Sequence, residues 1–189
     1  GLVGSEMCIR DRSGTSDNFQ KFLSAASDGK WEGEGKAFPQ KVGAGANGST
    51  AVAEQVNATN GAITYVEAGY ARDLELGVAN VDFGAGPVEL NNDTVNAALD
   101  KVEFKSEGND MVVDADALFA QQEADSYPLI LTTYEIVCSK YDDEKTRNQV
   151  KDFLTVVLES QDAELEDAGF IPVSGEFADK LRESVNAIS

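Results

Sequence analysis

The sequence contains no histidine. Without an imidazole, a Ser-His-Asp or Cys-His nucleophile system and a histidine metal site are excluded. Cysteine is almost absent as well, because Cys8 and Cys138 are the only two and form neither a CxxC pair nor a zinc-binding spacing. We therefore expect no bound metal and no cofactor.

Basic residues are scarce. The chain has 15 Lys and Arg against 34 Asp and Glu, which gives a formal net charge of -19 at pH 7. A surface this acidic repels nucleic acid and anionic membranes, and no basic cluster offsets it. Nucleic-acid binding is not expected, and any bound phosphate has to be held by local dipoles against the overall field.

Long apolar runs are missing too. No run reaches the roughly 18 residues of a membrane span, and the N-terminus lacks the apolar region of a signal peptide. With 189 residues, 42% hydrophobic and 26% charged, the composition is that of a globular chain. This length suits one domain or two small lobes with a real core.

Residues 1–12 show neither a helical nor a strand period. Their second half, Met7–Arg12, looks like the translation of an adapter used to prepare sequencing libraries. We therefore predict that residues 1–12 are a non-native leader outside the fold. The alternative interpretation is an ordinary terminal tail.

The first strong local signal is the hydroxyl-rich turn of Ser13, Gly14 and Thr15. A helical apolar face follows it, made of Phe19, Phe22, Leu23 and Ala26. Serine and threonine at a helix start are common N-caps. The same arrangement can hold an oxyanion, because glycine permits close approach and the first N–H groups lie at the positive end of the helix dipole. The tripeptide alone does not decide between a cap and an anion site.

Residues Gly43–Gly48 spell G-x-G-x-x-G, and Glu67 follows 19 residues after the last glycine. This spacing imitates the dinucleotide fingerprint, which needs a buried strand directly before the glycines. The preceding stretch contains Pro39 and two lysines and is a poor central strand. We interpret the segment as a loop whose glycines permit close helix packing, and keep a dinucleotide-binding enzyme as the weaker alternative.

The rest of the chain alternates between helical and strand patterns, which is typical of an α/β fold. One expected helix begins at Ser49 and is ended by Asn57–Gly61. Further helices are expected over residues 68–74 and 145–158, in the C-terminal stretch around Phe177, Leu181 and Val185, and after a cap at Asp93 or Thr94, where the helix carries Val95, Ala98, Leu99 and Val102. Expected strands cover residues 63–66, 76–83 and 127–138. The last of these should be buried, with Cys138 as a small buried hydrophobic side chain.

Taken in order, these segments resemble the second half of the phosphate-binding proteins that serve phosphate ABC transporters. The resemblance covers residues 13–189 and depends on Ser13-Gly14-Thr15 with its helix, Gly43–Gly48, Asn60–Glu67, Tyr70-Ala71, Ser126–Tyr134 and Asp167–Pro172. It implies an α/β, two-lobe periplasmic-binding-protein-like (type II) fold with the N-terminal half missing. Residues 13–125 would form most of the second lobe, and residues 126–189 would return into the first.

The resemblance also implies a function. Such a protein captures inorganic phosphate between its lobes and delivers it to an ABC transporter permease, without catalysing a reaction. It works as a monomer outside the cytoplasm, in the periplasm or as a cell-surface lipoprotein. Carried over to this sequence, the phosphate-binding residues are Ser13, Gly14 and Thr15.

Two departures from the family pattern matter. The family places an arginine four residues before the serine, where this chain has Ile9. The carboxylate that accepts the ligand's proton lies in the missing half. A binding protein for another oxyanion, sulfate or molybdate, is therefore an open alternative, as is a hydrolase using Ser13 or Ser16, although it would lack a histidine base.

Overall fold

The computed structural model describes residues 8–10, 13–27, 29–39 and 43–189. The chain forms two compact units. Unit 1 comprises Gly1–Asn80 with Ala168–Phe170, and unit 2 comprises Val81–Asp167 with Ile171–Ser189. These units divide the chain at other positions than the two expected lobes, and the lobe boundary at residue 125 stays a prediction.

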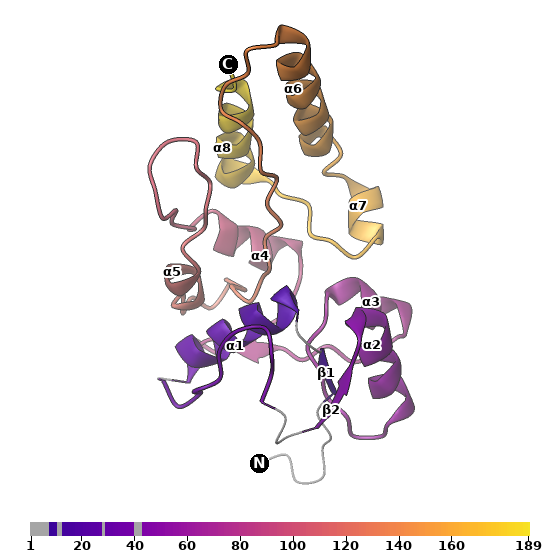
Figure 1. Cartoon of the computed structure of the whole chain (residues 1–189). Helices are drawn as coiled ribbons and strands as arrows, with labels where there is room; N and C mark the ends of the chain where they lie inside the picture. Colours follow the sequence, from indigo (N-terminus) through magenta and orange to yellow (C-terminus); the bar gives the residue numbers. More distant parts are fainter. Residues whose placement is uncertain (1–7, 11–12, 28, 40–42) are drawn as a thin grey trace. The chain divides into compact units, whose positions relative to one another are not determined.

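The described residues of unit 1 form three helices and a short parallel sheet (Figure 1). The helices are α1 (Gly14–Ala26), α2 (Gly48–Ala58) and α3 (Ala68–Asp73). Strand β1 (Cys8–Arg10) pairs in parallel with β2 (Ala44–Ala46), in a register that sets residue 8 opposite residue 44. All three helices lie where the sequence predicts them.

The expectation that residues 1–12 take no part in the fold is wrong for Cys8–Arg10, which form β1. Strand pairing uses backbone N–H and C=O groups, so a segment without an apolar period can still pair. Residues 1–7 and 11–12 lie outside the described residues. The adapter origin of this stretch stays a prediction.

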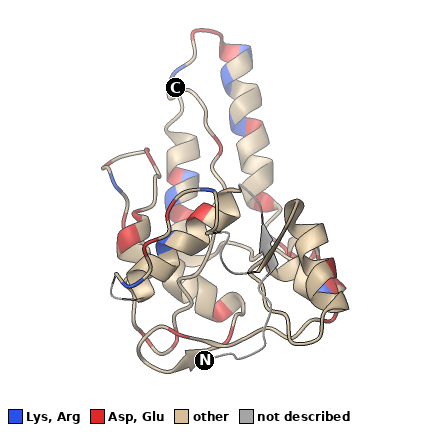
Figure 2. Ribbon diagram, turned by 60° about the horizontal axis from the view of Figure 1, so that its bottom comes forward, with Lys and Arg blue, Asp and Glu red and all other residues tan. Residues whose placement is uncertain are grey.

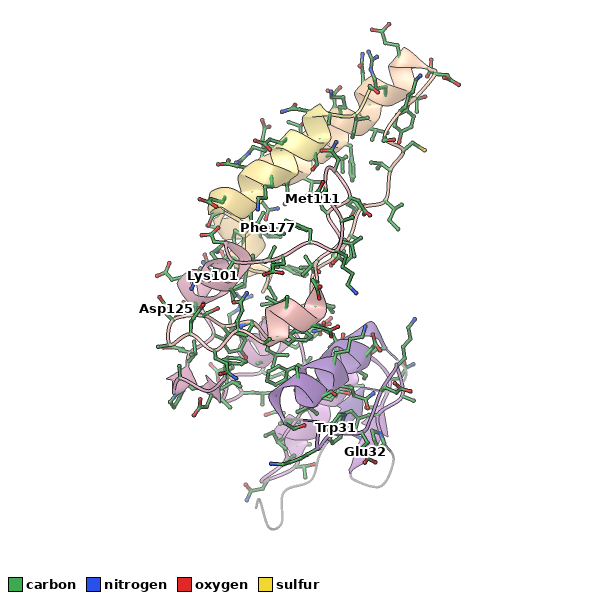
Figure 3. The ribbon with its side chains drawn as sticks, turned by 90° about the vertical axis from the view of Figure 1, so that its left-hand side faces the viewer. Trp31, Glu32, Lys101, Met111, Asp125 and Phe177 are labelled. Atoms are coloured by element: carbon green, nitrogen blue, oxygen red, sulfur yellow. The ribbon has the colours of Figure 1, made fainter. Side chains whose placement is uncertain are left out.

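Aromatic side chains form the centre of unit 1. Phe38 and Tyr65 are buried, and Phe19, Leu23 and Trp31 pack against them. The ring centroids of Phe19 and Tyr65 lie 4.3 Å apart, and those of Trp31 and Phe38 lie 5.1 Å apart. Figure 3 labels Trp31 beside α1. Since such ring pairs add to the energy of area burial, this cluster anchors α1.

Two expectations for unit 1 need correction. The predicted loop at Gly43–Gly48 contains strand β2, and the predicted strand at residues 63–66 is reduced to one bridge residue, Ile63. A strand forms only where a neighbouring segment supplies backbone partners. The sequence of a segment does not show whether such a neighbouring segment lies beside it in the fold.

Unit 2 is mostly helical, with one short antiparallel pair of strands. Strand β3 (Val81–Asp82) pairs with β4 (Pro87–Val88). The helices are α4 (Asn92–Leu99), α5 (Ala115–Phe119), α6 (Glu144–Glu159), α7 (Ala163–Asp167) and α8 (Gly175–Asn186). Helices α6 and α8 lie side by side (Figure 1). Of the strand expected over residues 76–83, only Val81–Asp82 forms, because only these two residues have backbone partners in β4.

The core of unit 2 is built on α4. Its buried apolar side chains include Val95, Ala98, Leu99, Val102, Leu118, Phe119 and Tyr127. The helix begins with a capping box in which Asn91 is the N-cap and Thr94 the third helical residue. The N-cap of α4 is therefore Asn91 and not the predicted Asp93 or Thr94, although Thr94 takes part in the capping box.

The largest correction concerns residues 127–138, which form no strand. Tyr127 and Pro128 are buried, but Ile136 is 93% exposed and Cys138 is an exposed free thiol. No segment among the described residues pairs with this stretch. An apolar β-forming run without a partner strand stays extended and exposed.

Charged residues are spread over the helices and loops of both units, with acidic ones prominent (Figure 2). In unit 2, Lys101 donates to Glu123 at 2.5 Å, and this hydrogen bond raises the pKa of Lys101. Figure 3 labels Lys101 near Asp125, which also raises that pKa.

Among the described helices, none is long and apolar enough to cross a lipid bilayer.

Candidate functional site

Ser13 caps the first turn of α1. Its backbone is extended (φ -119°, ψ 161°), and its Oγ accepts from the N–H of Ser16 at 3.1 Å. Its carbonyl oxygen accepts from the N–H of Asp17, also at 3.1 Å. The N-cap interpretation of this serine is therefore confirmed.

Gly14 is the first residue of α1 and lies on the exposed surface. No atom comes within 4 Å of the point where a Cβ would stand on this glycine. The N–H groups of a first helical turn have no acceptor within the helix, and they lie at the positive end of its dipole. The start of α1 is thus open and carries donors suited to an anion.

The Thr15 hydroxyl reaches across unit 1. Thr15 Oγ1 donates to Glu67 Oε1 at 3.3 Å, and Ser49 Oγ donates to Glu67 Oε2 at 2.5 Å. Thr15 is the second residue of α1 and Ser49 the second residue of α2. Through the carboxylate of Glu67, the first turns of the two helices are held together.

Ser16 anchors the same turn to the core. It is 0% exposed, and its Oγ lies 2.7 Å from the hydroxyl of buried Tyr65. Ser13 Oγ lies 3.2 Å from Ser16 Oγ. A fully buried Ser16 cannot meet a substrate, so it is not a hydrolase nucleophile.

The structure thus brings Ser13, Gly14 and Thr15 together at one helix start and adds two residues that the sequence did not assign to it. Ser49 was expected only as a helix start, and Glu67 only as part of an imitated dinucleotide fingerprint and as the end of the segment Asn60–Glu67 that carries the family resemblance. The sequence does hold one signal that links Ser49 to the first site. A polar residue, then glycine, then a residue with a hydroxyl group occurs both at residues 13–15 and at residues 47–49. Both copies open a helix.

The glycine segment does not match a dinucleotide site. Gly45 lies in the middle of β2 and Gly48 (φ 87°) is the first residue of α2, whereas the fingerprint requires its glycines after the strand. No atom lies within 4 Å of a Cβ built on either glycine. The expected role of these glycines in close helix packing is therefore wrong for Gly45 and Gly48.

The acidic side chains offer no metal centre among the described residues. In the part of the chain that the structure describes, no group of three or more His, Cys, Asp or Glu side chains is arranged to hold a metal ion. The donors at the start of α1 are hydroxyl and backbone N–H groups. These groups suit an anion better than a cation.

A family model described as "PBP superfamily domain" matches residues 10–161. Among known proteins, the chain is similar to the phosphate-binding protein PstS 3 of Mycobacterium tuberculosis, with 41% identity over 182 residues. It is also similar to the phosphate-binding protein PstS 2 of the same organism, with 38% identity over 182 residues. Each alignment covers 95% of this chain and 49% of the relative.

A more distant relative is the phosphate-binding protein PstS of Haemophilus influenzae, with 28% identity over 91% of this chain and 51% of that protein. The chain therefore spans about half the length of the curated relatives that it matches. The names of these relatives describe phosphate binding and no reaction. The resemblance predicted from the sequence is confirmed by these similarities.

Proposed function

Because the chain belongs to the PBP superfamily, we propose that it captures inorganic phosphate at the first turn of α1. The observation that carries this proposal is the open, donor-bearing helix start at Gly14, next to the cap of Ser13 and the hydroxyl of Thr15. The relatives named as phosphate-binding proteins support phosphate as the anion.

Electrostatics explain why the donors have to be local. The chain carries a net charge of -19, which disfavours a phosphate near its surface. A helix N-terminus places partial positive charge and aligned N–H groups within contact distance of the anion, where they act more strongly than distant charges. The proposed site therefore combines backbone donors of Gly14 and Thr15 with the hydroxyl groups beside them.

The whole protein would be a two-lobe solute-binding protein of type II that passes phosphate to an ABC transporter permease. This role makes no bond, needs no cofactor and is performed by a monomer outside the cytoplasm, in the periplasm or as a lipoprotein at the cell surface. The half-length match to the relatives supports a longer parent with a further N-terminal half.

The same proposal assigns residues 13–125 to most of the second lobe and residues 126–189 to the return into the first. Exposed apolar side chains in the return segment support it. Leu131 is 51% exposed and Ile136 93% exposed, and on α6 the side chains of Phe153 and Val156 are 60% and 58% exposed. Apolar side chains of this kind become exposed when the part of the protein that would cover them is absent.

Sulfate and molybdate are tetrahedral like phosphate, and binding of another oxyanion is the second candidate for the same site. It is distinguished by titration with each anion. No observation favours an enzyme that uses Gly43–Gly48, because the glycines do not follow a strand in the order that a dinucleotide site requires.

The test removes one backbone donor and keeps the helix. Proline is well tolerated as the first residue of a helix, and the extended backbone of Ser13 suits a following proline. Gly14→Pro therefore deletes the N–H of residue 14 alone. Gly14→Ala is the matched control, because it keeps that N–H and its Cβ has no protein atom within 4 Å. Phosphate is titrated into the isotope-labelled chain, and the amide signal of Thr15 is followed.

The wild type should show saturable, weak binding, because donors from one lobe do not enclose the anion. Gly14→Pro should bind about tenfold more weakly, the loss of a hydrogen bond to a charged group. Gly14→Ala keeps the N–H of residue 14 and should bind more tightly than Gly14→Pro. Equal binding by the proline and alanine variants, or no response of the wild type, would contradict the proposal.

A further inference from the structure

Two asparagines of this chain are followed directly by glycine, Asn47 before Gly48 and Asn60 before Gly61. An asparagine side chain reacts most readily with the next backbone nitrogen when the next residue is glycine, because glycine has no Cβ to obstruct the approach. Both asparagines are exposed. The two pairs lie at opposite ends of α2, where the fold holds the backbone in different ways.

The reaction is an internal substitution. The backbone nitrogen of the glycine loses its proton to hydroxide and attacks Cγ of the asparagine, while the side-chain nitrogen takes a proton from water and leaves as ammonia. Water then opens the resulting succinimide ring at either carbonyl, which yields aspartate or isoaspartate with one new negative charge. The reaction requires a glycine N–H that is open to water and an asparagine ψ angle that can turn until the nitrogen meets Cγ.

Asn60 lies in a tight turn after α2. The N–H of Ala62 donates to the carbonyl oxygen of Thr59 at 3.1 Å, and Gly61 has a φ of 79°. Since Asn60 does not have a positive φ, these values indicate a type II turn with glycine at its third position. The N–H of Gly61 takes no part in the hydrogen bond of such a turn, and it has no partner among the described residues. A single hydrogen bond therefore closes the turn around Asn60.

Asn47 is held from both sides. Its ψ angle is 107°, β2 ends directly before it, and α2 begins directly after it. Ser49, the second residue of α2, donates its hydroxyl proton to the carboxylate of Glu67 at 2.5 Å. A rotation of the Asn47 ψ angle large enough for ring closure would move the start of α2 away from β2. Such a movement breaks the hydrogen bond between Ser49 and Glu67.

We propose that Asn60 is a site of spontaneous deamidation and that the fold protects Asn47 from the same reaction. The product adds a negative charge to a chain whose net charge is already -19. In the isoaspartate form it also adds a methylene to the backbone between the end of α2 and Glu67. This inference does not depend on the proposed phosphate binding.

The experiment compares the native chain with the same chain unfolded in urea, in one mildly alkaline buffer. A glutamate-specific protease cuts after Glu54 and so separates the two pairs into peptides 35–54 and 55–67. Isotope-resolved mass spectrometry then gives the deamidated fraction of each peptide over time.

In urea the two pairs should deamidate at similar rates, because no fold distinguishes them. In the native chain Asn60 should react at least about tenfold faster than Asn47, since only Asn47 has to break a hydrogen bond to a charged group. Equal native rates, a faster reaction at Asn47, or no reaction at Asn60 would overturn the proposal.

Asn60→Gln is the matched variant. It keeps an exposed amide at the turn, but a glutamine has to close a six-membered ring, which forms far more slowly. The native variant should show no deamidation of peptide 55–67, and Asn47 should react as it does in the wild type. Asn57 lies in the same peptide and precedes Ala58 within α2. Deamidation of this peptide that persists in Asn60→Gln would therefore place the reaction at Asn57 and contradict the assignment to Asn60.

Discussion

At the scale of single residues, polar groups inside unit 1 set tight local constraints. Gln20 is fully buried, and its Nε2 donates to the carbonyl oxygens of Gly35 at 2.6 Å and Ala37 at 3.1 Å. Its Oε1 and the Nε1 of Trp31 are buried without a hydrogen-bond partner among the described residues. Both atoms face the backbone of Gly33. The loop after α1 is thus held by one side chain, and its glycine has no room for a Cβ.

Gly33→Ala should therefore destabilise the protein. The new Cβ would collide with Gln20 Oε1 and lie 2.7 Å from Trp31 Nε1, and Gln20 is held by its two hydrogen bonds. Overpacking of this kind costs about 1–3 kcal/mol. Chemical denaturation measures the loss, with Gly14→Ala as the control in open space. Equal stability of the two variants would show that the loop yields easily.

At the scale of elements, the longer helices lie where the sequence predicts them, whereas the short helices α5 and α7 were not predicted and most of the predicted strand residues form no strand. The apolar face of α1 and the start of α2 could be predicted because a helix forms its hydrogen bonds within one segment. The run at residues 127–138 has β-forming residues, but a strand also requires a partner that local sequence does not contain. For the same reason β2 was missed, although residues 44–46 pair with β1.

Helix caps offer a test by pH at the start of α6. Hydrogen bonds from the Thr146 hydroxyl at 2.6 Å and from its N–H at 2.8 Å lower the pKa of Asp143 below 3.8. A carboxyl with a lowered folded pKa contributes stability above its unfolded pKa and loses it as the pH falls through the folded value. The first turn of α6 should therefore loosen only at pH values below 3.8.

The amide shift of Thr146 against pH measures this titration. In Thr146→Val the hydroxyl donor is lost, and the midpoint should move upward toward the ordinary aspartate value. A midpoint in the wild type at 3.8 or above would contradict the capping role. The side chain of Asp143 is solvent-exposed, so the expected effect is a shift of midpoint rather than a large change of overall stability.

At the scale of the whole molecule, exposed apolar surface in unit 2 is the feature that needs an explanation. The segment of Leu131 and Ile136 and the α6 face of Phe153 and Val156 are apolar and exposed. A match to only 49% of the relatives' length fits the proposal that a further half of a longer parent covers them. Solitary exposed apolar residues are ordinary, but a run of them marks an interaction surface.

Ile136→Ser should therefore leave the stability of this chain unchanged, because the side chain is 93% exposed. Val95→Ala is the matched change in the core of unit 2, where the side chain is 2% exposed, and it should cost about 2 kcal/mol. Thermal unfolding measures both. A large loss of stability in Ile136→Ser would show that the segment is already packed.

The sequence by itself determined the helices other than α5 and α7, the capping serine at residue 13 and the absence of histidine chemistry, because these depend on neighbouring residues or on composition alone. Only the tertiary structure decided that Thr15 and Ser49 meet at Glu67 and that Cys138 is exposed. Thr15 and Glu67 are 52 positions apart, and their contact depends on how the tertiary structure brings the segment before α3 to the first turn of α1 rather than on any local pattern. Burial of a strand depends likewise on partners that are distant in sequence.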